Sequence, residues 1–236
     1  MDHQMNQKYF TAKASTPLLI AGLVLVLLGL VAAFAVYELR IIGIVVAVVG
    51  GVMLLLSSSK KVKDSDVDDG IARAQKAFEE EFVDKFITDH SRSAGLKVSA
   101  DAPKPKRRGK PEYFYCYWFK DVQHVKRGGD GKARSSTYCF SGILIDPDEL
   151  SLGKKLASLI EAKADEAWTK APFAELEKAE LVDAPVDAAY TQFARYAILR
   201  VTKKGGEIFA EIPLTADATA DKIAAEINQS IARFAE

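Results

Sequence analysis

The sequence predicts an α+β protein, in which a two-helix transmembrane hairpin precedes an amphipathic helix and an antiparallel-sheet domain with packed helices. Three observations support this class: two long apolar runs near the N-terminus, a phenylalanine stripe with helical spacing after them, and alternating apolar strands around a Gly-Gly pair near the C-terminus. They divide the chain into a transmembrane hairpin (1–59), an amphipathic connecting helix (60–92), a basic linker (93–111) and a cytoplasmic α+β domain (112–236).

The charge balance and the cysteine count restrict the function classes. The 236 residues hold 32 Lys and Arg against 32 Asp and Glu, so the chain is neutral at pH 7. Generic nucleic-acid binding needs a net basic surface, and nucleic acid is therefore not an expected partner. Two cysteines are too few for a disulfide framework or a zinc site, and we expect no metal and no cofactor.

Two apolar runs, residues 17–36 and 39–59, follow each other with only a short turn between them. At about 1.5 Å per residue, a twenty-residue helix covers about 30 Å, the thickness of a bilayer's hydrocarbon core. The pattern therefore predicts a lipid bilayer as a partner. A cleaved signal peptide is the alternative for the first run, because the stretch 33–35 resembles a cleavage site.

Each apolar run carries two glycines seven residues apart, Gly22 with Gly29 and Gly43 with Gly50. Seven residues are nearly two helical turns, so the two glycines of a run share a face. Small residues let helix backbones approach closely, and these glycines are the predicted packing site of the hairpin. The runs contain no polar group that would indicate a transport path.

The flanking cations predict the orientation. Lys8 and Lys13 precede the first run, and Lys60, Lys61 and Lys63 follow the second. Under the positive-inside rule, both termini are cytoplasmic, and the protein is a two-pass protein of the cell's inner (plasma) membrane. The cysteines are then expected to be reduced.

A stripe of apolar residues at helical spacing follows the hairpin and predicts the amphipathic helix. Its members are Val67, Ile71, Ala74, Phe78, Phe82 and Phe86. Asp64, Ser65 or Asp66 is the expected cap. We expect the stripe to pack on its own domain, with a groove-binding or oligomerisation face as the alternative.

The segment after this helix loses periodicity and gains prolines, which indicates a linker. It concentrates five basic residues, namely Lys104, Lys106, Arg107, Arg108 and Lys110. A solvated linker is the favoured interpretation. The functional alternative is contact with anionic lipid, which attracts such clusters only within about a Debye length of the membrane.

The clearest hairpin surrounds Gly205-Gly206, because both positions of a two-residue turn favour residues that accept positive φ. Closing the chain there pairs Lys204 with Glu207, Thr202 with Phe209, and Arg200 with Glu211. One face of the pair is then charged and the other apolar, as in a half-buried antiparallel sheet.

Further helices are expected around this hairpin. A C-terminal helix carries isoleucines at 223, 227 and 231 at helical spacing, with Asp217 or Thr219 as its N-cap. The leucines of residues 146–168 predict another helix, and a short helix is expected after Pro172.

The run Tyr113–Phe119 is a predicted strand paired with the stretch 136–145. Through a two-residue turn near residue 129, Cys116 and Cys139 fall on one face at neighbouring or diagonal positions. Burial of both faces is the favoured interpretation. A lipid-interface belt, a small-ligand pocket and base stacking are the alternatives.

No motif predicts catalysis. The three histidines, His3, His90 and His124, are far apart and lack metal-ligand spacing. The "KRGGDGK" stretch lacks the phosphate-loop spacing, and a cysteine nucleophile would need a positioned base. We therefore expect a protein that is not an enzyme.

The hairpin followed by "SSSKKVKDSDVDDGIARAQKAFEE" and a domain ending "TKKGGEIFAEI…DKIAAEINQSIARF" resembles uncharacterised bacterial membrane-anchored proteins. In those, the cytoplasmic part is similar to a pleckstrin-homology-like domain, in which antiparallel strands are closed by one C-terminal helix. The resemblance implies that fold here and no catalytic residues. The helical insert expected at 148–182 departs from it.

The resulting prediction is a membrane-anchored cytoplasmic binding or scaffold module that is non-catalytic and contacts a protein partner or a second copy of itself. The alternative is an accessory subunit of a larger membrane protein complex, docked through its transmembrane hairpin.

Overall fold

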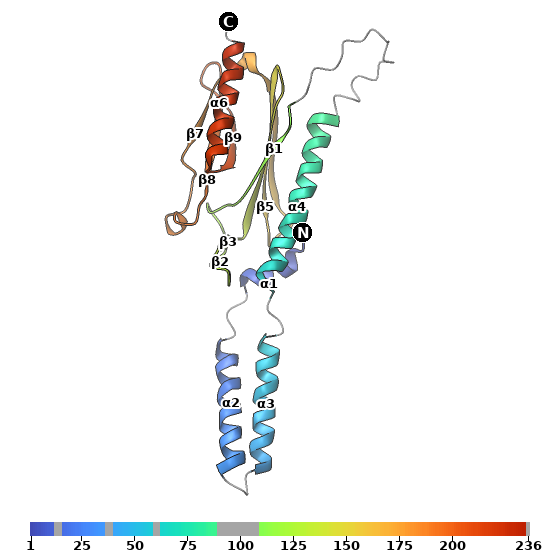
Figure 1. The fold of residues 1–236 in the computed structure, drawn as a ribbon, viewed down its shortest axis with the longest axis vertical. Coiled ribbons are helices and arrows are strands. Elements are labelled where there is room, and N and C mark those ends of the chain that lie inside the picture. Colours follow the sequence, from blue (N-terminus) through green and yellow to red (C-terminus); the bar gives the residue numbers. More distant parts are fainter. Residues whose placement is uncertain (12–15, 36–39, 59–61, 89–108, 235–236) are drawn as a thin grey trace. The chain divides into compact units, whose positions relative to one another are not determined.

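The computed structural model describes residues 1–11, 16–35, 40–58, 62–88 and 109–234 (Figure 1). The chain divides into two compact units, which we call the helical unit (Gln4–Val67) and the sheet unit (Met1–His3 with Asp68–Glu236). The helices that begin before residue 68 are α1 (His3–Thr11), α2 (Thr16–Ala35), α3 (Arg40–Ser58) and α4 (Asp64–Val83).

The helical unit is built on the α2–α3 hairpin. Pro17 lies in the first turn of α2, where a missing N–H costs no helical hydrogen bond. In the same unit, the Tyr9 hydroxyl of α1 donates a hydrogen bond of 2.7 Å to the Asp64 carboxylate. At the start of α4, the Asp66 carboxylate accepts from the Lys63 N–H at 3.0 Å, so Asp66 caps from inside the first turn.

The structure contradicts the predicted transmembrane hairpin and the two-pass placement in the inner membrane. Over the described side chains, which are residues 20–34 in α2 and 40–55 in α3, no helix is both long and apolar enough to cross a bilayer. The description is therefore corrected to a packed apolar helical hairpin.

The sheet unit contains a four-stranded antiparallel sheet in the order β1-β4-β5-β6, a β2-β3 hairpin and a three-stranded sheet in the order β7-β8-β9 (Figure 1). The strands are β1 (Glu112–Tyr117), β2 (Val125–Arg127), β3 (Ala133–Ser135), β4 (Thr137–Ile145), β5 (Glu149–Ser158), β6 (Ala164–Pro172), β7 (Leu176–Val182), β8 (Tyr196–Lys203) and β9 (Ile208–Thr215). The remaining elements are the π-helical turn η2 (Asp84–Thr88), the 3₁₀ turns η3 (Phe173–Glu175) and η4 (Ala188–Tyr190), and the C-terminal helix α6 (Ala218–Arg233).

The helices predicted between residues 146 and 182 are wrong. Strands β5 and β6 occupy most of that stretch, and only the turn η3 follows Pro172 before β7. Leu150 and Leu152 alternate with Ser151 and Gly153 and are fully buried. These leucines follow the period of two that is typical of a strand. This pattern outweighs the helix-favouring composition around it, because both leucines enter the core.

α4 packs its phenylalanine stripe on one face of the four-stranded sheet, as the favoured interpretation predicted. Phe82 is fully buried, and a Cβ added at Gly142 or Gly153 would lie 2.5 Å or 3.0 Å from its ring. These glycines pair with each other across β4 and β5, so together they leave room for the rings of Phe82 and Trp168. Trp168 of β6 stacks on Phe78 with ring centroids 5.4 Å apart.

The other face of this sheet and the three-stranded sheet enclose the main core with α6. The core residues from both sheets include Phe114, Ile143, Leu152, Leu199, Val201, Ile212 and Leu214. α6 adds Ile223, Ile227 and Ile231 to this core, and Asp217 caps its N-terminus by accepting from the Thr219 N–H at 2.9 Å. The predicted helix, its buried isoleucines and one of its two candidate caps are confirmed.

The β8–β9 turn follows the predicted glycines, with φ of +102° at Gly205 and +83° at Gly206. Arg200 pairs with Glu211 as predicted, and their side chains form an ion pair of 2.8 Å. The register shifts by one residue next to the turn, where Thr202 pairs with Ile208 instead of Phe209. A β-bulge therefore replaces the last predicted pairs, because Phe209 is the extra residue.

Candidate functional site

The four predicted packing glycines lie where α2 and α3 are in contact. A Cβ added at Gly29 would lie 2.6 Å from the carbonyl oxygen of Gly43, and one at Gly43 would lie 2.6 Å from that of Gly29. A Cβ at Gly50 would lie 2.7 Å from the carbonyl oxygen of Gly22. Since real Cβ atoms do not approach so closely, only glycine permits this backbone contact.

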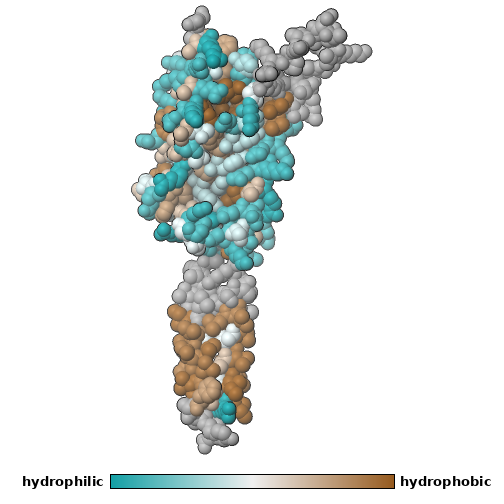
Figure 2. Space-filling view, viewed as in Figure 1, coloured by the Kyte–Doolittle hydropathy of each residue, from teal (hydrophilic) through white to brown (hydrophobic). Residues whose placement is uncertain are grey.

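Apolar side chains cover most of the hairpin face in view (Figure 2). Leu27, Val31 and Ile42 are 56%, 62% and 60% exposed, and Phe34 is 82% exposed. The side chains of a folded protein rarely present so many large apolar groups without a partner surface. The glycine contact joins the two helices and leaves their outer faces uncovered within the described helical unit.

The predicted basic cluster lies almost wholly outside the described residues. Lys104, Lys106, Arg107 and Arg108 belong to the stretch 89–108, which the structure does not describe, as does His90. Lys110 is exposed just before β1.

The two described histidines make backbone contacts. His3 lies with its Nδ1 3.3 Å from the carbonyl oxygen of Leu159, and the backbone N–H of His124 donates to the Ser136 hydroxyl. Among the described residues, no group of three or more His, Cys, Asp or Glu side chains is placed to hold a metal ion.

Cys116 and Cys139 are directly paired across β1 and β4, which confirms their predicted neighbouring placement. Both are free cysteines. The contact with Cys139 and burial raise the pKa of the Cys116 thiol well above its ordinary value. A protonated thiol is a poor nucleophile, so this pair favours packing over covalent chemistry.

A half-open cleft of about 430 Å³ lies beside the end of β1. Most of its lining comes from β1, the β2–β3 hairpin and the stretch 192–195 before β8, and Tyr138 of β4 and Thr215 of β9 complete it. The aromatic part of its wall is formed by Tyr115, Tyr117 and Phe193. Its positive charge comes from Lys132 and Arg195. The volume falls in the range of small-molecule pockets.

The segment that completes the cleft is fixed to the sheets by backbone bonds. The Asp187 N–H donates to the Phe119 carbonyl at 3.0 Å, and the Ala216 N–H donates to the Arg195 carbonyl at 3.0 Å. The Tyr196 hydroxyl accepts from the Phe119 N–H at 3.1 Å. Burial raises the pKa of both Tyr138 and Tyr196 to about 12, so these phenols stay neutral at pH 7.

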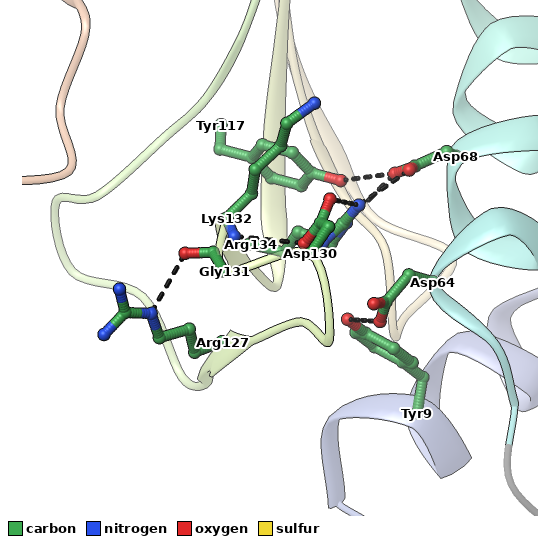
Figure 3. A network of polar contacts seen from close by, with 9 residues as sticks. All are labelled: Tyr9, Asp64, Asp68, Tyr117, Arg127, Asp130, Gly131, Lys132 and Arg134. Atoms are coloured by element: carbon green, nitrogen blue, oxygen red, sulfur yellow. Dashed lines mark hydrogen bonds and ion pairs between the residues drawn. The ribbon is translucent and has the colours of Figure 1, made fainter.

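A buried arginine lies beside the cleft, on β3 (Figure 3). The Arg134 side chain is 2% exposed and donates to two carboxylates: to Asp68 of α4 at 2.7 and 3.0 Å, and to Asp130 at 2.9 Å. The Tyr117 hydroxyl also donates to Asp68, at 3.3 Å. This network joins the β2–β3 hairpin to α4 and thereby positions Lys132, which stands between Asp130 and Arg134.

The network predicts an acid-sensitive contribution to stability. Hydrogen bonds from the Arg134 guanidinium and from the Lys132 N–H lower the pKa of Asp130 from 3.8 to about 2. Because the pKa is lower in the folded state, the contribution is fully present above about pH 4 and disappears as the pH falls toward about 2. Asp130→Asn should therefore lower the urea midpoint at pH 5 and leave it nearly unchanged at pH 2.

The control for this measurement is Glu177→Gln, at an exposed position of β7. It should change the midpoint equally little at both pH values. Equal midpoint losses for Asp130→Asn at pH 5 and pH 2 would contradict the role of Arg134 in holding this carboxylate ionised.

Sequence reasoning missed the cleft and the arginine network. The stretch 188–193 was not assigned to any element, and the glycine-rich turn was expected to join the two paired strands directly. In the structure the strand-to-strand connection contains a separate hairpin, whose register differs from that of β1 and β4. The one available signal was the basic and aromatic composition of "QFARY" beside β8.

Comparison of this chain with protein-family models, with curated proteins and with solved structures finds no match in any of the three.

Proposed function

We propose that this protein is a non-catalytic binding module that docks onto a larger assembly through the α2–α3 hairpin. The observation that carries the proposal is the exposure of large apolar side chains on the hairpin, such as Val31 and Ile42. Covering such a side chain is worth roughly 25 cal/mol per Å² of apolar surface. When two helices are joined through glycine backbone contacts, their larger side chains remain available to a partner.

The sheet unit is the part that such docking would present. We propose that it is pleckstrin-homology-like, in accordance with the resemblance of the sequence. Support comes from its four-stranded and three-stranded antiparallel sheets and its C-terminal helix α6. The helical insert that departed from this fold is absent from residues 148–182, which form strands and one 3₁₀ turn.

The docking proposal is tested with Val31→Lys/Ile42→Lys, which places two charges on the exposed apolar surface. The matched control is Ala225→Lys/Gln229→Lys on the exposed side of α6. Each tagged chain is cross-linked in its native host and its size is measured by native electrophoresis. We expect the wild type and the control to migrate in a complex larger than the 25.8 kDa monomer, and the hairpin variant to leave that complex.

Two outcomes would contradict the proposal. The first is a wild-type chain that purifies without any additive as a monodisperse monomer. The second is flotation of the purified wild-type chain with protein-free lipid vesicles while no other chain is cross-linked to it, because lipid and not a protein assembly would then cover the hairpin.

A further inference from the structure

We propose that the cleft beside β1 binds an organic anion with a flat apolar body, such as an aryl carboxylate. This inference concerns the sheet unit alone and does not depend on the docking of the hairpin. It rests on three features of the cleft: the charge of its lining, the unpaired edge of β1, and the aromatic wall.

The charge of the lining selects for an anion. Lys132 and Arg195 both line the cleft and are exposed, and among the described residues that line it none is Asp or Glu. Neither cation takes part in an ion pair within the described parts of the chain. By contrast, the neighbouring Arg134 is fully engaged by two carboxylates and is not available to a ligand.

The edge of β1 adds hydrogen-bond donors. The Trp118 N–H donates to the Thr137 carbonyl at 3.0 Å, which fixes the alternation of the β1–β4 ladder. Residues of β1 at even positions therefore bond to β4, and the backbone N–H groups of Tyr115 and Tyr117 point to the other edge. β1 is the last strand of its sheet, so the described strands offer these groups no ladder partner.

The wall of the cleft accommodates an apolar body. Tyr115, Tyr117 and Phe193 line it, and the hydroxyls of both tyrosines already donate to Glu79 and Asp68 of α4. The tyrosines therefore offer ring surface, while their hydroxyls are held at α4. An aromatic ring packs well on such surfaces, and a carboxylate on it would meet Lys132 or Arg195.

The test compares 2-naphthoate with its neutral amide, 2-naphthamide. Binding to the full chain, with α2 and α3 covered by a neutral detergent, is measured by isothermal titration calorimetry. We expect the wild type to bind the acid at least about 10-fold more tightly than the amide. Arg195→Gln and Lys132→Gln should each weaken acid binding about 5- to 20-fold and leave amide binding unchanged.

The matched control is Lys222→Gln, which removes an exposed cation from α6, away from the cleft. It should leave the binding of both compounds unchanged. Gln192→Glu, at an exposed position of the lining, adds a carboxylate without removing a cation and should also weaken acid binding. Equal affinities for acid and amide in the wild type, or an acid preference that survives in Lys132→Gln/Arg195→Gln, would overturn the proposal.

Discussion

Phe82→Ala is expected to lower the free energy of unfolding of the sheet unit by about 3 to 5 kcal/mol, the range for truncating a buried phenylalanine. Phe82 is fully buried between α4 and the four-stranded sheet, and its ring lies 5.6 Å from Tyr113 and 6.2 Å from Trp168. Truncation leaves a cavity above two glycines, which have no side chains to fill it. Urea unfolding followed by tryptophan fluorescence measures the loss.

A double-mutant cycle with Gly142→Ala tests the fit directly. Alone, Gly142→Ala should destabilise by about 1 to 3 kcal/mol, because its Cβ would lie 2.5 Å from Phe82 and force the ring to move. In the Phe82→Ala background, the same change should become neutral or stabilising. The nearest atoms to the new Cβ all belong to Phe82, and alanine loses less backbone entropy than glycine on folding.

The control for lost apolar surface is Ile208→Ala, since Ile208 is 52% exposed. It should cost less than about 1 kcal/mol. If Gly142→Ala destabilises equally with and without Phe82, the glycine pair has a backbone role and is not required for the packing of α4.

The packing of α4 could be predicted from the sequence only in part. The spacing of Phe78, Phe82 and Phe86 is sufficient to predict a helix and its buried face. It could not show which surface covers that face, because Gly142 and Gly153 lie 60 and 71 positions after Phe82 and resemble breaks in their strands. Only the β4–β5 register places them opposite each other.

The two hairpin regions show one correct and one wrong prediction from a local sequence pattern. Gly205-Gly206 fixes a turn locally, and the predicted pair of Arg200 and Glu211 is confirmed. In residues 146–168, by contrast, the leucines at 152, 156 and 159 fit a helical period, and those at 150, 152 and 156 fit a strand period. Pairing on both sides, with β4 and with β6, decides between the two, and the period of one segment does not show those partners.

The candidate cleft could not be predicted from the sequence for a related reason. Lys132 and Arg195 are 63 positions apart by number, and neither belongs to a periodic pattern. They line one cleft because the β2–β3 hairpin and the stretch before β8 both return to the end of β1. The sequence does predict the aromatic strand itself and left a small-ligand pocket open as one of its interpretations.

Asp68→Ala is expected to destabilise the sheet unit more than Arg134→Met does, although Arg134 is the buried member of the pair. The guanidinium is 2% exposed, whereas the Asp68 side chain is 50% exposed. Removing Asp68 leaves a buried cation with fewer hydrogen-bond acceptors, which we expect to cost about 2 to 3 kcal/mol. This value is below the usual range for breaking a buried pair, because Asp130 still neutralises the charge.

Arg134→Met instead removes the buried charge and keeps an apolar chain in place of the aliphatic part of the arginine. The two carboxylates it releases are partly exposed and regain water, so the expected cost is about 1 kcal/mol or less. Urea midpoints of the two variants at pH 7 measure the difference. Asp69→Ala, the exposed neighbour of Asp68 on α4, is the matched control and should change the midpoint little.

The reverse order, with Arg134→Met the more destabilising variant, would show that the ion pairs themselves hold the β2–β3 hairpin on α4. The expected order means that Arg134 is retained for a reason other than stability. Its two-carboxylate contact fixes the hairpin in one position on α4, and this places Lys132 at the cleft. Arg134→Met should therefore weaken naphthoate binding even where it barely changes the urea midpoint.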